Sequence, residues 1–239
     1  MGYKLLRFVK SIISKRIFLS LKIIFVSLFK NNSFSLYGID LEIDKIINKS
    51  DGYFVELGAN DGVTQSNTLR LERSKNWNGL LIEPYPENYM YCVHFRGNKN
   101  RVVSAACVDF EYNEKFVELE YSNLTTSQVL DTTSAERDQK RDYLQNHEDF
   151  VTFGARAYTL SAILLKAEAP RLIDFMSLDV EGAELGVLRG IDFSIHNFRY
   201  ILVETSNFQS VESLLNQHKY SFIKKLTFHD YLFKLVDES

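Results

Sequence analysis

The feature that most constrains this sequence is a regular alternation of short apolar runs with segments of helical spacing. Strand-like runs occupy 53–57, 78–84, 101–110, 172–180 and 198–205, with helical spacing at 39–50, 66–76, 85–98, 159–167, 182–191 and 210–218. Repeated strand–helix units predict an α/β fold with a mostly parallel open sheet and helices on both faces. We expect residues 115–121 to form an outlying strand and residues 220–236 a C-terminal antiparallel hairpin.

The first 30 residues form a basic arm that differs from the rest of the chain. They carry seven lysines and arginines and no acidic residue, between runs of Leu, Ile, Phe and Val. Lys15, Arg16 and Lys22 interrupt the apolar runs, so no stretch reaches the ~18 uncharged residues that a spanning helix needs. Two interpretations stay open: an amphipathic helix on an anionic membrane surface, or a helix packed on the domain or on a second subunit of a homo-oligomer.

The sequence divides into this arm, residues 1–30, and one domain, residues 31–239, with a polar insertion at 122–150. Thr133 and Glu136 in the insertion are spaced as a capping box, so we expect a surface loop with an exposed helix. A long polar insertion in a compact domain is either a functional lid or a solvated connector. The residues do not choose between the two.

Overall charge and cysteine content limit the partners and the compartment. A formal net charge of −3 gives no general reason to expect binding to nucleic acid. Cys92 and Cys107 stand in apolar surroundings and fit no metal-binding spacing, so we predict buried free thiols. Free thiols favour a reducing compartment, hence a cytoplasmic protein, at the inner face of a membrane if the arm binds lipid.

The first two strand ends carry the signature of a nucleoside site. In open α/β sheets ligands bind beyond the carboxyl ends of the strands. Gly58 and Gly62 follow the first strand, where glycine permits a tight turn, and Glu83 ends the second strand, placed to bond both ribose hydroxyls. The spacing lacks the dinucleotide G-x-G-x-x-G, and the nearby acids Glu56 and Asp61 suit a cationic cofactor better than a pyrophosphate.

Further carboxylates gather at the later strand ends. Asp179 and Glu181 stand at the end of the strand at 172–180, and Glu204 stands at the end of the next one. Glu184 has a structural explanation, since an acid in the first turn of a helix stabilises its dipole. His229 and Asp230 come from the closing hairpin and should lie nearby. Asp179, Glu181 and Glu204 could alternatively hold magnesium or calcium.

Several of these motifs resemble one known family. The runs YFVELGANDGVTQSNT, GLLIEP, FMSLDVEGAELGVLRGIDF, ILVET and HDYLF are similar to those of the FkbM family of S-adenosylmethionine-dependent methyltransferases. The resemblance extends from about Tyr53 to the C-terminus, and DVEGAE is its most specific motif. It implies a Rossmann-like methyltransferase fold and O-methylation of sugar or natural-product hydroxyls. It also implies cofactor contacts at Glu56, Gly58, Asn60, Ser66, Asn67, Glu83, Ala105 and Ala106.

Methyl transfer to a hydroxyl of a small-molecule or glycan acceptor needs in-line positioning and a proton acceptor. We expect Asp179 to touch both cofactor and acceptor, with Glu181 and His229 as candidate bases. Two other classes of function remain: an NAD-dependent oxidoreductase on the same fold, and a non-catalytic membrane-tethered interaction module. Nucleic acid is not expected as a partner, because the basic residues are concentrated in the apolar arm rather than in an aromatic, basic groove.

Overall fold

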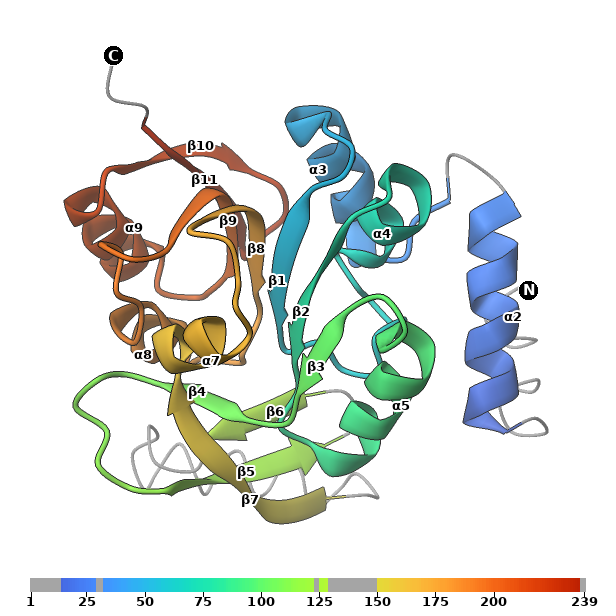
Figure 1. The fold of residues 1–239 in the computed structure, drawn as a ribbon, viewed down its shortest axis with the longest axis horizontal. Helices are drawn as coiled ribbons and strands as arrows, with labels where there is room; N and C mark the ends of the chain where they lie inside the picture. The colour runs from blue at the N-terminus through green and yellow to red at the C-terminus, as the bar shows by residue number, and fades with distance from the viewer. Residues whose placement is uncertain (1–13, 29–31, 123–124, 129–149, 237–239) are drawn as a thin grey trace.

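The computed structural model describes residues 14–28, 32–122, 125–128 and 150–236. A large sheet orders its strands β10-β11-β9-β8-β1-β2-β3 (Figure 1). In chain order these are β1 (Tyr53–Leu57), β2 (Asn78–Ile82), β3 (Arg101–Val103), β8 (Leu172–Leu178), β9 (Asn197–Glu204), β10 (Tyr220–Lys225) and β11 (Asp230–Leu235). The first five are parallel, whereas β10 and β11 form an antiparallel hairpin on β9. The predicted open sheet and closing hairpin are confirmed.

Helices cover both faces of this sheet, as Figure 1 shows. One face packs on α3 (Ile39–Ile47), α4 (Leu69–Lys75) and α5 (Pro86–Arg96), and the other on α7 (Leu160–Lys166), α8 (Glu184–Arg189) and α9 (Phe208–Gln217). Successive side chains of a strand point to opposite faces. In β1, Phe54 therefore joins Ile43 and Trp77, while Val55 joins Leu160 and Val187. Because both faces are buried, the parallel strands have continuous apolar sequences.

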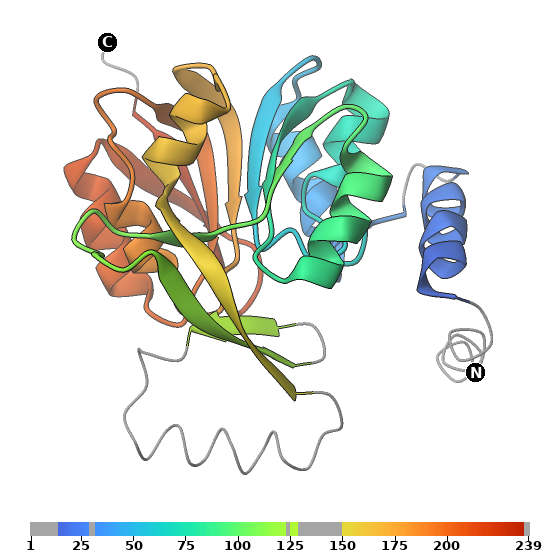
Figure 2. The same cartoon turned by 60° about the horizontal axis from the view of Figure 1, so that its bottom comes forward.

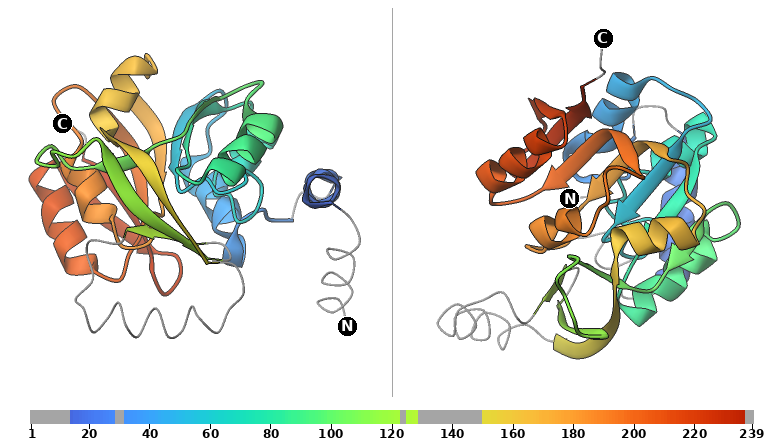
Figure 3. Two further views of the ribbon diagram at one scale, coloured as in Figure 1. Left: turned by 90° about the horizontal axis from the view of Figure 1, so that it is seen from below. Right: turned by 60° about the vertical axis from the view of Figure 1, so that its left-hand side comes forward.

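A second, four-stranded sheet lies across the carboxyl ends of the parallel strands (Figures 2 and 3). Its order is β4 (Ala106–Val108), β7 (Phe150–Thr159), β5 (Phe116–Ser122) and β6 (Thr125–Gln128). The single strand predicted at 101–110 is therefore wrong in one respect. The chain leaves the large sheet after Val103 and enters the small sheet at Ala106, and the mostly apolar sequence of both strands does not reveal the change, although β4 is buried and β3 only partly so.

The polar region also differs from the prediction. The predicted outlying strand at 115–121 is confirmed as β5, but residues 125–128 pair with it as β6 rather than forming a loop. The capping-box residues Thr133 and Glu136 lie outside the described residues. β7 was not predicted, although Val151, Phe153, Ala155 and Ala157 alternate as a strand requires. It continues directly into α7, which joins the small sheet to the core.

The described part of the arm forms α2 (Lys15–Leu28), preceding the short helix η1 (Leu36–Gly38). α2 lies outside α5, and its buried residues Leu19 and Val26 pack with Phe34, Val63 and Leu69. Of the two interpretations left open for the arm, packing on the domain is what one face of this helix shows. Among the described residues, no helix is long and apolar enough to cross a membrane.

Candidate functional site

A cavity of about 330 Å³ lies beyond the carboxyl ends of the parallel strands. Its walls come from the ends of β1, β2, β8 and β9, and Leu119 of β5 contributes from the small sheet. The predicted residues that line it are Glu56, Gly58, Asn60, Ser66, Asn67, Glu83, Ala105, Ala106, Asp179, Glu181 and Glu204. The neighbours of β1 are β2 on one side and β8 on the other, so the cavity sits at the switch in strand order.

Gly58 brings the ends of β1 and β8 into direct contact. It has a φ of +73°, and a Cβ atom there would lie 1.8 Å from the backbone oxygen of Asp179. Any other residue would be both sterically blocked and conformationally strained. The backbone N–H groups of Gly58 and Ala59 donate to the carbonyl of Ile82 at 3.1 and 3.2 Å, which extends the sheet pairing into the turn.

Glu83 connects the end of β2 to this turn. Its Oε2 accepts a hydrogen bond from the backbone N–H of Asn60 at 2.8 Å, and its Oε1 accepts one from that of Tyr85 at 2.8 Å. Burial raises the pKa of the Glu83 carboxyl to about 7. Each carboxylate oxygen can accept about two hydrogen bonds. Glu83 lines the cavity, so the remaining acceptor positions are available to a pair of ligand hydroxyls.

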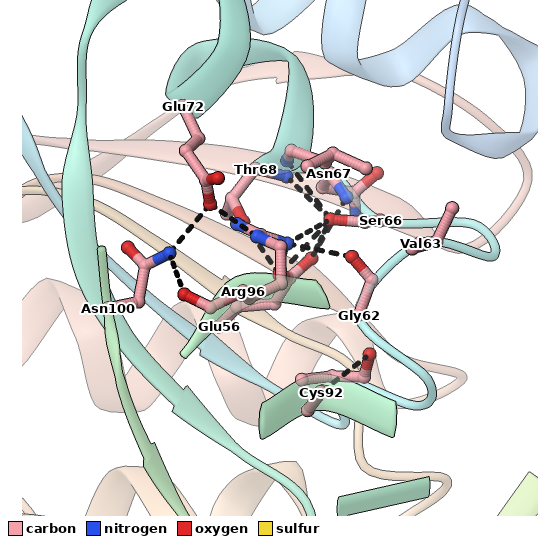
Figure 4. A network of polar contacts seen from close by, with 12 residues as sticks. Glu56, Gly62, Val63, Ser66, Asn67, Thr68, Glu72, Cys92, Arg96 and Asn100 are labelled. Carbon is pink, nitrogen blue, oxygen red and sulfur yellow. Dashed lines mark hydrogen bonds and ion pairs between the residues drawn. The ribbon is translucent and has the colours of Figure 1, made fainter. Parts of the chain in front are cut away.

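Glu56 lies at the end of β1 but is engaged by the loop that follows it. Its carboxylate accepts hydrogen bonds from the hydroxyls of Ser66 and Thr68 at 2.9 and 2.6 Å, and from the backbone N–H of Asn67 at 3.0 Å. The guanidinium of Arg96 adds an ion pair at 3.5 Å (Figure 4). Glu56 therefore holds residues 66–68 against the cavity.

Arg96 was not predicted as part of the site. Its side chain is fully buried, forms an ion pair with Glu72 and donates to the carbonyl of Gly62 at 2.9 Å. Asn100 in turn donates to Glu72 at 2.7 Å (Figure 4). Because Arg96 pairs with two buried carboxylates and also binds Gly62 and Thr68 at the two ends of the loop, it holds the loop in place.

Two amide oxygens at the cavity have no hydrogen-bond partner in the described part of the chain: Oδ1 of Asn60 and Oδ1 of Asn67, both fully buried. The amide nitrogen of Asn67 donates to the Ser177 hydroxyl at 3.0 Å, which fixes the orientation of that side chain. Leaving a buried acceptor unsatisfied costs free energy. Both residues line the cavity, so they fit a ligand that brings hydrogen-bond donors or positive charge.

Carboxyl groups crowd together on the opposite side of the cavity. Burial raises the pKa of Asp179 well above its usual range, and the adjacent Glu204 raises it further. Burial also raises the pKa of Glu204, as does the nearby Asp230. Asp179 and Glu204 are hydrogen-bonded to each other, so this pair retains a proton that isolated carboxyl groups would lose.

The remaining predicted acids and His229 occupy different places. Glu181 lines the cavity, with an exposed side chain and a φ of 55°. Glu184 is buried and accepts from the backbone N–H of Gly182 at 2.7 Å, in keeping with the structural role assigned to it. His229 is exposed and is not among the residues that line the cavity, although its carbonyl accepts from Thr205 at 2.8 Å.

Two further predictions from the sequence concern the cysteines and a metal ion. Cys92 and Cys107 are free and buried, as predicted. Within the described ranges, no group of three His, Cys, Asp or Glu side chains is placed to hold a metal ion. Leu119 and Leu36 also line the cavity and were missed, because they come from segments whose position the sequence does not indicate.

This chain is similar to known proteins of one family. A family model described as the methyltransferase FkbM domain matches residues 56–229. The search of curated proteins found no match to this chain. Among solved structures, the methyltransferase FkbM from Methylobacillus flagellatus KT is similar, with 12% identity and a TM-score of 0.43 over 77% of this chain. The match covers 43% of that chain, so this chain corresponds to less than half its length.

Two further solved structures have a similar arrangement. The precorrin-6y C5,15-methyltransferase from Geobacter metallireducens GS-15 has 10% identity and a TM-score of 0.41, over 86% of this chain and 90% of that one. The human methyltransferase 10 domain containing protein has 10% identity and a TM-score of 0.43, over 83% of each chain. The family model spans most of the chain, including the cavity residues from Glu56 to Glu204, and the chain belongs to the FkbM family of methyltransferases.

Proposed function

We propose that this chain binds S-adenosylmethionine in the cavity and methylates a hydroxyl group of a sugar or glycan-type acceptor. The observation that carries the proposal is the hydrogen bond between the N–H of Asn60 and the carboxylate of Glu83. It joins the glycine turn to the acid at the next strand end, the two features expected to hold an adenosine. Family membership favours this function over the oxidoreductase alternative.

The residues at the cavity fit that cofactor. Glu83 offers acceptors for the two ribose hydroxyls, and the buried Ala105 and Ala106 provide an apolar surface suited to the adenine. The unsatisfied Oδ1 atoms of Asn60 and Asn67 are suited to the amino group of the methionyl part. Asp179 and Glu204 give the far wall negative charge when ionised, which favours a cation.

When bound, S-adenosylmethionine supplies a methyl carbon made electrophilic by its positively charged sulfur. The chain must then hold the acceptor hydroxyl in line with that carbon and take up its proton. We assign both tasks to the carboxyl groups around Asp179. As the new O–C bond forms and the C–S bond breaks, the hydroxyl proton passes to an ionised carboxylate of the cluster formed by Asp179, Glu181 and Glu204. His229 is a weaker candidate, because it does not line the cavity.

Calorimetric titrations with S-adenosylmethionine and its demethylated product test the two halves of this assignment. Glu83→Gln should weaken both ligands equally, because both carry the ribose. Asp179→Asn should weaken S-adenosylmethionine more than the product, because only the former carries the sulfonium charge. Glu114→Gln, at an exposed residue that does not line the cavity, removes the same charge and serves as the matched control. Unchanged affinity of Glu83→Gln for both ligands would refute the ribose assignment.

Transfer of a labelled methyl group to a panel of sugars, phenols and amines tests the acceptor class. We expect label only on hydroxyl acceptors, and a loss of turnover in Asp179→Asn that exceeds its loss of cofactor affinity. Label on an amine, or full turnover in both Asp179→Asn and Glu181→Gln, would contradict the proposal. His229→Gln should retain most of the activity.

A further inference from the structure

Helix α2 has two apolar faces, and among the described residues only one of them packs against the domain. Leu19 is 1% exposed and Val26 8% exposed, and both pack against the domain. A helix at the surface of a globular protein normally directs polar residues away from the core. The outward face of α2 does not follow this rule.

Four residues form the outward row: Ile17, Leu21, Ile24 and Leu28, which are 50%, 52%, 57% and 70% exposed. Spacings of four, three and four residues place them on one stripe of the helix. In Figures 2 and 3, α2 stands at the outer edge of the molecule. A contiguous exposed apolar row of this kind indicates an interaction site.

The charge of the same segment identifies the partner. Residues 1–30 contain seven basic and no acidic residues, although the whole chain has a formal net charge of −3. Lys15, Arg16 and Lys22 belong to α2 itself. Apolar side chains together with basic residues are the combination that an anionic lipid surface attracts.

A second copy of this chain fits the row less well. Pairing two such helices would bring together two segments that contain basic and no acidic residues. A typical stable interface buries about 800 Å² of surface on each partner. Four side chains that are between half and 70% exposed supply much less surface than this. We propose that the outward face of α2 binds the surface of an anionic bilayer, with the helix axis parallel to it.

Such binding would fix how the domain meets the lipid. The ammonium of Lys15 donates to Oδ1 of Asn88 at 3.2 Å and lies 3.8 Å from Asp61. Asn88 lines the cavity, so the start of α2 is attached directly to the cavity wall. The surface contact would therefore hold the cavity next to the bilayer.

Flotation of the full chain with vesicles tests the proposal. One vesicle set contains phosphatidylcholine with about 30% phosphatidylglycerol, and the other phosphatidylcholine alone. The wild type should bind the anionic set, with little binding to the neutral set or at high salt, where surface charges are screened. Leu21→Ser with Ile24→Ser should bind about tenfold or more weakly, because apolar area no longer leaves water.

The matched control is Leu165→Ser with Ile223→Ser, which removes one leucine and one isoleucine that are 56% and 42% exposed on other elements. It should bind as the wild type does. Thermal unfolding verifies that both double variants fold. The proposal is overturned if the wild type does not bind anionic vesicles, if the α2 variant binds as well as the control, or if sedimentation shows a dimer that the α2 variant loses while vesicles bind neither protein.

Discussion

The two sides of the cavity use the same chemical group in opposite ways. On the nucleoside side, made by Gly58, Asn60 and Glu83, the Glu83 carboxylate is held by two backbone N–H groups. On the carboxylate side, made by Asp179 and Glu204 with Asp230 nearby, burial raises the pKa values of Asp179 and Glu204, and the negative charge of Asp230 raises both further. The nucleoside side is held in place by hydrogen bonds. On the carboxylate side, ionisation of all the groups is unfavourable unless a proton or a cation neutralises part of the charge.

This contrast separates shape from charge within one cavity. The nucleoside side depends on backbone geometry, so changes there should damage folding or affinity for any ligand with a ribose. The carboxylate side depends on ionisation, so changes there should alter pH dependence and the preference for a positively charged ligand. The following variants test that division, beginning with the largest expected effect.

Gly58→Ala should be the most damaging change on the nucleoside side. The added Cβ would meet the backbone oxygen of Asp179, and alanine would also be held at a φ of +73°. Overpacking and left-handed strain together should cost at least about 3 kcal/mol in the free energy of unfolding, measured in urea. Gly182→Ala is the control beside the carboxylates, where the φ is +102° but no atom lies within 4 Å of the new Cβ. An equal loss in both variants would show that contact with Asp179 is unimportant.

Arg96→Met should produce the next largest effect. It leaves Glu56 and Glu72 buried without their cation, and breaking a buried ion pair in this way costs about 3–5 kcal/mol in unfolding free energy. Affinity for the demethylated cofactor should also fall, because the loop from Gly62 to Thr68 is no longer held. Arg70→Met, which removes a less buried pair with Asp44, should cost less. The network has no special role if the two losses are the same.

The affinity of the nucleoside side should depend on pH. The pKa of Glu83 is raised to about 7 by burial, and the ionised form is the better acceptor for ribose hydroxyls. Affinity for the demethylated product should therefore rise about tenfold between pH 6 and pH 8, as the ionised fraction of a group with this pKa does. Calorimetry at constant ionic strength measures this, and Glu83→Gln should remove most of the change. A Glu83→Gln variant with the same pH dependence would assign the titration to another group.

The smallest effect concerns stability at the carboxylate side in the absence of ligand. The folded-state pKa of Asp179 lies above its usual value, chiefly because of burial, so the folded chain binds a proton that the unfolded chain releases. Stability should therefore fall as the pH rises from the usual Asp pKa toward the folded one. Asp179→Asn cannot ionise and should have a shallower decline in melting temperature between pH 5 and pH 8. Identical slopes would mean that Asp179 ionises normally in the folded chain.

Most of the large sheet could be predicted because its strands and helices differ in the spacing of their apolar residues. Short apolar runs and helical spacing distinguish β1 from α4, and the rule that ligands bind at strand ends places Gly58 and Glu83 together. The break between β3 and β4 could not be predicted, since hydrophobic sequence reports burial and not which sheet provides it. The sequence of β7 alternates as a strand requires, but it directly follows the polar insertion, whose composition is typical of a loop.

The supporting residues of the site were harder to predict than those that line it. Arg96 is the last residue of α5 and looks like an ordinary basic helix end, so no sequence signal marks it as fully buried. His229 stands beside Asp230 in sequence, yet it lies in the bend before β11 and is exposed, whereas Asp230 begins β11 and is buried. Adjacency in sequence was a poor guide to which side chain joins the carboxylates.

Helices α2 and α3 belong to the packed structure, although they lie outside the region that the family model matches. The family model begins at residue 56, but Ile43 and Phe34 are buried in clusters with residues beyond that point. A shortened protein that started at residue 56 would lack most of β1 and the helices α2 and α3. The apolar side chains that pack against these elements would then be exposed to water. Expression of this chain should therefore retain the residues that precede the family boundary.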